Sequence, residues 1–283
     1  MILRQISSEG TKMIFNTIMV QLDVDSPAAP RTNYALELAR RFEATLIGFA
    51  AADSYVFVPG DDGGMAAAEI MRERRIEIED RLKILKEEFL GLVGDDATWR
   101  EEIGDPTRLL AKHARAADLV VTGTPVSGAD HHRVVDIGTS VLSAGRPVLI
   151  AADRLVPPDP KKVLVAWKDT REARRAVTDA LPFLTGAQDV LVATIEEQNQ
   201  RDARESVSDV VRYMMRHGIK ARSEILDSDR RDACETIVGL AHGMGANLVV
   251  AGGYGHSRLF EWAFGGMTRS LLRNGSVNRL FSN

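Results

Sequence analysis

Three glycines near the carboxyl end of the chain have a spacing that suits a phosphate-binding loop. Gly252, Gly255 and Gly265 follow an apolar run and are separated by two and nine residues. Glycine lets the backbone approach a ligand closely, and the predicted helix over residues 267–273 would offer unpaired N–H groups to an anion. Thr268 adds a hydroxyl in the first turn. A second interpretation stays open, in which these glycines serve only turns and helix packing.

Other motifs that carry chemistry are missing from the sequence. It has no Gly-x4-Gly-Lys-Ser/Thr phosphate loop, no Gly-x-Gly-x-x-Gly after the first predicted strand and no Gly-x-Ser-x-Gly nucleophile elbow. We therefore predict no catalytic residue.

A metal site is not expected either. His131 and His132 are adjacent, so their side chains are expected to point in different directions, and the other histidines show no ligand spacing. Cys234 is the single cysteine and lies among apolar residues of a predicted helix, which predicts a small buried side chain.

The elements that must position the glycines repeat along the chain. Residues 13–23 and 162–168 are apolar runs, each followed by a break and an amphipathic segment. The runs ADLVVTG at 117–123 and ANLVVAG at 246–252 correspond at a constant offset of 129. Continuous β-branched runs are typical of strands buried on both faces of a parallel sheet.

Further segments complete the alternation of strands and helices in each half. Predicted strands cover residues 44–51, 98–103, 145–152, 187–195, 221–226 and 277–282, and long predicted helices cover 69–92 and 201–217. The order indicates an α/β fold of two tandem, doubly wound, five-stranded parallel-sheet domains. Three prolines in residues 153–161 mark the linker, so the predicted domains are 1–155 and 160–283.

Composition limits the partners. The 283 residues carry 36 Lys and Arg against 40 Asp and Glu, a net charge of −4, which argues against binding nucleic acid through phosphate neutralisation. No apolar run reaches the roughly 18 residues of a membrane helix, and residues 1–12 lack the apolar region of a secretory signal. We expect no membrane partner and a cytoplasmic location.

The Gly-x2-Gly-x9-Gly spacing after a fourth strand, and two similar halves of this topology, resemble a tandem universal stress protein. The resemblance covers nearly the whole chain from Ile14 onward. It implies that the two domains pair within one chain, that two chains can form a homodimer, and that ATP, with Mg²⁺ accompanying it, is the cofactor. One subgroup of the family binds ATP at this motif and another does not.

The resemblance also implies site residues in the second half. Gly252, Gly255, Gly265 and Gly266 map to phosphate and ribose contacts, and Met267 and Thr268 to the two positions after them. Ala166, Lys168 and Thr194 map to the adenine-side positions at the tips of the first and second strands of that half.

Two residues depart from the family pattern. Gly266 occupies a position that is normally Ser or Thr, so one hydroxyl contact is absent unless Thr268 replaces it. Lys168 stands where nucleotide-binding members usually carry an Asp, and an ammonium cannot accept a hydrogen bond. Two roles stay open for Lys168: contact with phosphate, or pairing with an acidic neighbour that blocks the cleft.

The first half shows the converse pattern. Asp23 is retained at its first strand tip, but the loop after residues 117–123 places Pro125 where a glycine is needed and is two residues too long before Gly138. Nucleotide binding is therefore predicted for the second half, with the first half structural.

The expected function is that of a universal stress response protein that binds an adenine nucleotide in its C-terminal domain and acts as a regulated binding module toward protein partners. One alternative is a scaffold of the same fold that binds no nucleotide, its halves paired through their fifth strands. Another is a slow ATP hydrolase, for which Asp169 is the nearby acid and Mg²⁺ ligands would be required.

Overall fold

The computed structural model of the protein describes residues 15–55, 63–94, 97–125, 128–155, 159–196, 200–227, 233–253 and 266–283. The N-terminal half, up to residue 155, alternates strands and helices as follows: β1 (Thr17–Leu22), α1 (Ala28–Phe42), β2 (Thr45–Ala52), α2 (Gly63–Val93), β3 (Thr98–Ile103), α3 (Pro106–Ala114), β4 (Leu119–Gly123), α4 (Ile137–Ser143) and β5 (Val148–Ala151).

The C-terminal half repeats this order, with a short extra helix after the first long one. Its elements are β6 (Lys162–Ala166), α5 (Arg171–Asp179), α6 (Leu181–Leu184), β7 (Asp189–Glu196), α7 (Gln200–Arg216), β8 (Ala221–Asp227), α8 (Ala233–Met244), β9 (Leu248–Gly252), α9 (Gly266–Arg273) and β10 (Asn278–Ser282). The predicted α/β fold of strands and crossover helices is confirmed.

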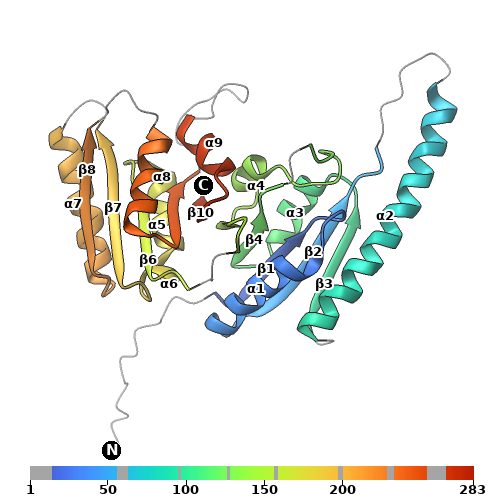
Figure 1. Cartoon of the computed structure of the whole chain (residues 1–283), viewed down its shortest axis with the longest axis horizontal. Helices are drawn as coiled ribbons and strands as arrows, with labels where there is room; N and C mark the ends of the chain where they lie inside the picture. The colour runs from blue at the N-terminus through green and yellow to red at the C-terminus, as the bar shows by residue number, and fades with distance from the viewer. Residues whose placement is uncertain are drawn as a thin grey trace, which may run out of the picture.

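The strands form one continuous sheet in the order β3-β2-β1-β4-β5-β10-β9-β6-β7-β8. Neighbours are parallel within each half, and β5 pairs antiparallel with β10 at the centre, with Leu149 opposite Leu280. The two halves therefore lie side by side along the sheet (Figure 1). Strand order reverses at β1 in one half and at β6 in the other, which are the two places where ligands collect in open α/β sheets.

The apolar strands bury both of their faces. One core layer contains α1, α2, α5 and α7, and the other contains α3, α4, α8 and α9; each layer includes strand residues of both halves. Cys234 is buried in the second layer, as its sequence context predicts. Phe15, Phe42 and Phe183 extend the first layer across the junction of the halves, with ring centroids 5.1 to 5.4 Å apart.

Buried polar residues also join the halves. Arg279 on β10 has no exposed surface and donates to the carbonyls of Leu271 and Leu272 in its own half. It also donates to Thr124 Oγ1 and the Ala151 carbonyl of the other half. Burial lowers the pKa of Arg279 to about 10, so the guanidinium keeps its proton at neutral pH. This side chain ties β10 to the carboxyl ends of β4 and β5.

In the parts of the chain that the structure describes, no helix combines the length and the apolar character needed to cross a membrane.

Candidate functional site

The carboxyl ends of β6, β7 and β9 bring four of the sequence-predicted site residues to one edge of the sheet. Ala166 ends β6 and pairs with Ala251, next to Gly252 at the end of β9. Thr194 lies on β7, one residue beyond the Ala193 that pairs with Ala166. Ala166 and Thr194 are buried, whereas Lys168, two residues past the end of β6, is exposed. The predicted adenine-side residues therefore share this edge with the first glycine of the motif.

Gly252 has a packing reason to be glycine. A Cβ at this position would lie 2.5 Å from the amide nitrogen of Ala173 and 2.7 Å from the carbonyl carbon of Glu172. Both atoms belong to the first turn of α5, which the Thr170 hydroxyl caps by accepting from the Ala173 N–H at 3.2 Å. The end of β9 thus packs directly on the backbone of α5.

Gly253 packs in the same way across the junction of the halves. A Cβ there would collide with the Val141 side chain of α4, and its N–H donates to the Ser282 carbonyl at 2.7 Å. Gly252 thus fits the packing interpretation that the sequence left open, and Gly253 beside it packs closely as well. This does not bear on Gly255 and Gly265.

The remaining predicted residues lie at or before α9. Helix α9 begins at Gly266, so Met267 and Thr268 fall in its first turn, as the sequence predicts for the phosphate side. Gly255 and Gly265 lie outside the described residues, and the side chains of Met267 and Thr268 do as well.

The equivalent edge of the N-terminal half holds a network of buried polar side chains. Asp23 Oδ2 accepts from Arg31 Nη2 at 3.0 Å, and Asp23 Oδ1 accepts from Gln21 Nε2 at 2.9 Å. Gln21 Oε1 accepts from Arg31 Nη1 at 2.9 Å and from the Thr122 hydroxyl at 2.7 Å. The side chains of Asp23 and Arg31 are 7% and 15% exposed, so this ion pair is largely shielded from water.

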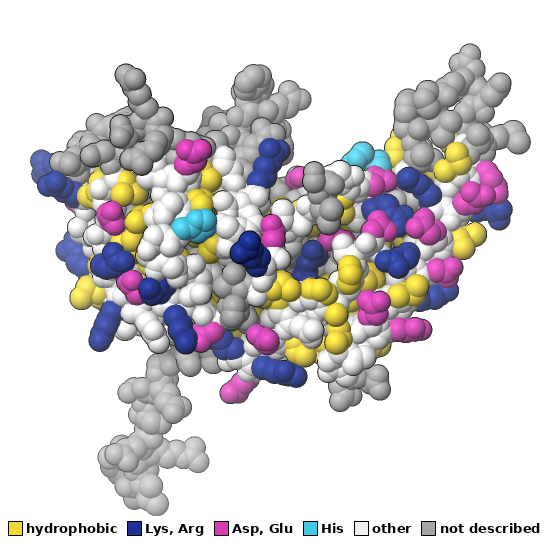
Figure 2. All heavy atoms as spheres, in the orientation of Figure 1, with side chains coloured by type: hydrophobic (Ala, Val, Ile, Leu, Met, Phe, Trp, Pro, Cys, Tyr) yellow, Lys and Arg dark blue, Asp and Glu magenta, His cyan; other side chains and the backbone are white. Residues whose placement is uncertain are grey.

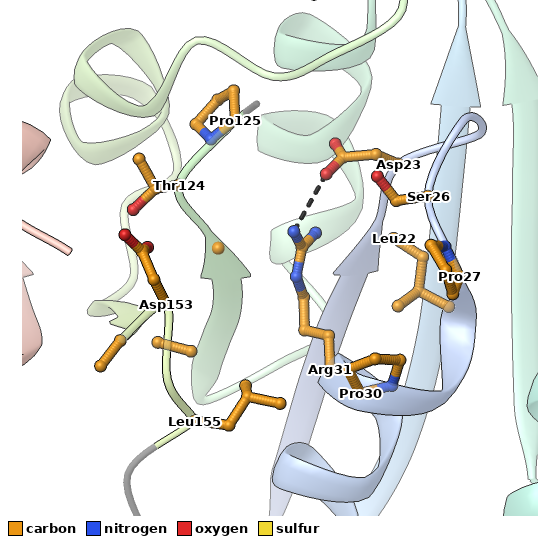
Figure 3. Close-up of a pocket in the computed structure, with 13 residues that line it drawn as sticks. Leu22, Asp23, Ser26, Pro27, Pro30, Arg31, Thr124, Pro125, Asp153 and Leu155 are labelled. Carbon is orange, nitrogen blue, oxygen red and sulfur yellow. Dashed lines mark hydrogen bonds and ion pairs between the residues drawn. The ribbon is translucent and has the colours of Figure 1, made fainter. Parts of the chain in front are cut away.

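A pocket of about 450 Å³ opens beside this ion pair (Figure 3). Figure 3 shows Arg31 pointing toward Asp23, with Thr124 and Asp153 on the opposite wall. A Cβ on Gly123 would lie 2.6 Å from Arg31 Nη2, so this glycine gives the guanidinium its room. The sequence pattern indicates Asp23 but not Arg31, because nothing local shows that a side chain of α1 reaches the tip of β4.

The loop between β4 and α4 is fixed to the rest of the N-terminal half by Arg133. Its buried guanidinium donates to both Asp25 oxygens at 2.6 and 2.7 Å and to Glu77 Oε1 at 3.1 Å. The hydrogen bond from Arg133 lowers the pKa of Asp25, and the same bond raises the pKa of Arg133. This loop carries His131 and His132, whose rings lie 4.0 Å apart by their centroids. The expectation that these side chains point apart is wrong.

A second pocket, of about 440 Å³, lies between α5 and α7 in the C-terminal half. Trp167, Val177 and Val210 line it among the buried residues. Trp167 Nε1 donates to Ser206 Oγ at 3.0 Å, which fixes the indole at the pocket wall.

The comparison with known families finds a match in the N-terminal half. Residues 15–151 match the model of the universal stress protein family. These residues are similar to a universal stress protein domain. No curated protein matches the sequence of the chain.

Solved structures extend the likeness to the whole chain at the level of the fold. A universal stress protein from Archaeoglobus fulgidus superposes with a TM-score of 0.70 at 15% identity, covering 95% of this chain and 96% of that one. A candidate universal stress protein from Pseudomonas aeruginosa gives a TM-score of 0.58 at 13% identity, covering 95% and 93%. A functionally unknown Pseudomonas aeruginosa protein gives 0.54 at 14%, covering 95% and 92%. At these identities the shared property is the fold.

Proposed function

We propose that this protein binds an adenine nucleotide, ATP, at the carboxyl ends of β6 and β9 and acts as a regulated binding module. The observation that carries the proposal is the placement of α9. The glycine-rich segment leaves β9 at Gly252, next to the reversal of strand order at β6, and the chain enters α9 at Gly266. A helix that starts at such a reversal presents its positive end to a ligand that lies over the strand tips.

In this proposal one side of the site binds the base and the other side binds the phosphates. Ala166 and Thr194 lie on the base side, where the small Ala166 leaves room at the end of β6. Gly265, Gly266, Met267 and Thr268 lie on the phosphate side, and Mg²⁺ would accompany the phosphates. Lys168 is exposed at the strand tip, so its ammonium group is accessible to a phosphate group bound there.

The family match and the fold support a binding function more than a catalytic one. Residues 15–151 match the universal stress protein family model, and the fold likeness to the Archaeoglobus fulgidus protein covers both halves. Asp169, the acid that the hydrolase alternative names, is paired with Arg174 at 2.6 Å. The hydrolase alternative would also require Mg²⁺ ligands beside this acid, and we do not propose it.

A scaffold that binds no nucleotide is the second candidate, and one observation favours it. Gly252 and Gly253 are both explained by close packing, on α5 and on α4, without any ligand. The pairing of β5 with β10 also joins the halves into one body that could present surfaces to protein partners.

The proposal is tested by measuring bound nucleotide and binding heat on the full chain. Small molecules released by denaturing freshly purified protein are identified by mass spectrometry, and ATP with Mg²⁺ is titrated by calorimetry. We expect close to one ATP per chain and loss of binding in Gly265→Val. An empty protein with no binding heat supports the scaffold instead.

A matched pair of variants locates the site. Thr268 in α9 and Thr139 in α4 are related by the offset of 129 between the halves. We expect Thr268→Ala to weaken ATP binding and Thr139→Ala to leave it unchanged. If Thr139→Ala or Asp23→Ala weakens binding while Thr268→Ala does not, the nucleotide site lies in the N-terminal half.

A further inference from the structure

Three side chains of the loop between β4 and α4 gather their ligand-type atoms at one point. Asp130, His131 and His132 each offer one oxygen or nitrogen within 4.8 Å of the other two. His131 Nδ1 lies 3.9 Å from Asp130 Oδ1, and the two imidazole rings are tilted by 41°. Figure 2 shows histidine side chains at the surface of the N-terminal half, next to charged side chains.

The rest of the structure holds this loop in place. Asp130 Oδ1 accepts the His132 N–H at 2.9 Å, and Asp130 Oδ2 lies 3.3 Å from Arg74 Nη1 of α2. The His132 carbonyl accepts the Asp53 N–H at 2.7 Å, and the Tyr55 ring lies 5.1 Å from the His132 ring. The positions of Asp130 and His132 are therefore set by α2 and by the residues that directly follow β2, all of which lie far from them in sequence.

These groups have the chemistry of a zinc-type site. Two imidazoles and one carboxylate are ligands that Zn²⁺ and similar divalent transition metals prefer, whereas Mg²⁺ and Ca²⁺ prefer oxygen ligands alone. With metal–ligand distances of about 2.0–2.2 Å, the ligand atoms of a tetrahedral site lie about 3.3 Å apart. The His131 side chain is 86% exposed, so rotation about its own bonds can close the remaining gap.

We propose that Asp130, His131 and His132 form a binding site for Zn²⁺ or a similar divalent transition metal. Asp130 would bind through Oδ1, and Arg74 on Oδ2 would orient the carboxylate, as outer-shell partners do in metal sites. Three protein ligands leave a coordination position open to solvent. The site lies in the loop that corresponds to the glycine-rich segment of the other half, and it does not depend on nucleotide binding.

The test is a calorimetric titration of the full-length, chelator-treated protein with Zn²⁺. We expect one Zn²⁺ per chain, no comparable binding of Mg²⁺, and an affinity at least about tenfold lower in His131→Ala and in His132→Ala. Asp130→Asn should weaken binding in the same direction. Far-UV circular dichroism checks that the variants stay folded, which the exposure of His131 favours.

His217→Ala is the matched control. His217 is also exposed and lies against a tyrosine, with its ring 4.7 Å from that of Tyr213. Its replacement should leave the Zn²⁺ affinity unchanged. The proposal is overturned if His131→Ala and His132→Ala bind Zn²⁺ as tightly as the unchanged protein, or if His217→Ala loses as much affinity as they do.

Discussion

The two places where the strand order reverses, at β1 and at β6, share one arrangement of strands but carry different side chains. In the N-terminal half the Thr122 hydroxyl of β4 donates to Gln21 Oε1 of β1, whereas in the C-terminal half Ala166 of β6 pairs with Ala251 of β9. The N-terminal edge has an ion pair and a pocket, and the C-terminal edge has small apolar residues and tightly packed glycine. The repeated fold thus sets the two positions at which a ligand can bind, and a few side chains determine whether protein atoms already occupy each position.

The helix that follows each first strand shows how this difference arises. In the C-terminal half, the first turn of α5 is capped by Thr170 and packs its backbone on Gly252. In the N-terminal half, α1 has no side-chain cap of its own, its Ala28 N–H donates to Glu88 of α2, and Arg31 extends to Gly123 instead. Backbone contact in one half is replaced by a long side chain in the other.

The largest expected effect comes from adding one methyl group at each strand end. Gly252→Ala should destabilise the protein by about 3 kcal/mol, because the new Cβ meets the backbone of α5, which cannot move aside. Gly123→Ala should cost about 1 kcal/mol, because it meets only the end of the Arg31 side chain. Urea unfolding measures both, and equal losses would remove the distinction between the two edges.

The next effect tests the polar network against its exposed counterpart. Asp23→Ala removes the charged partner of the mostly buried Arg31 guanidinium and should cost about 2 kcal/mol. Arg174→Ala removes one partner of the exposed Asp169–Arg174 pair beyond the other strand tip and should cost less than about 0.5 kcal/mol. A loss for Asp23→Ala no greater than that for Arg174→Ala in thermal unfolding would show that the N-terminal network is not stabilising.

The stability of the protein should depend on pH through the ion pair of Asp25 with Arg133, which fixes the loop between β4 and α4. The pKa of Asp25 is lowered from 3.8 in the folded protein by the Arg133 hydrogen bond. A carboxyl group whose pKa is lower in the folded than in the unfolded protein stabilises the fold fully when the pH is above its unfolded pKa. This stabilisation is lost as the pH falls through its folded pKa. Asp25→Asn should therefore reduce the fall of the melting temperature below about pH 4. At pH 7 the same variant should have a modestly lower melting temperature than the unchanged protein. The same acid decline in both proteins would contradict this role.

The smallest expected effect concerns Lys168 at the C-terminal edge. Because Lys168 is exposed, Lys168→Ala should change stability by less than about 0.5 kcal/mol. If its ammonium contacts phosphate, ATP affinity should fall by up to about fivefold, and by less at high salt. Calorimetry at two salt concentrations measures this, and a rise in affinity would show that Lys168 blocks the cleft.

The sequence by itself determined the elements and their order. Runs of β-branched residues predicted the buried strands, helical spacing predicted the helices, and the repeat at an offset of 129 predicted two similar halves, because these patterns depend on residues close together in the chain. The same local reasoning placed Met267 and Thr268 at the start of α9 and Cys234 in the core.

Only the tertiary structure decided which distant residues meet. The sequence offered pairing of the fifth strands as part of one alternative, and the structure supplies the antiparallel register of β5 with β10. The reach of Arg31 to Gly123 and the four acceptors of the buried Arg279 join segments that no sequence period connects. The close approach of the His131 and His132 rings also depends on contacts from Asp53 and Tyr55. Packing in three dimensions sets such contacts, since each depends on where the whole sheet brings its strand ends together.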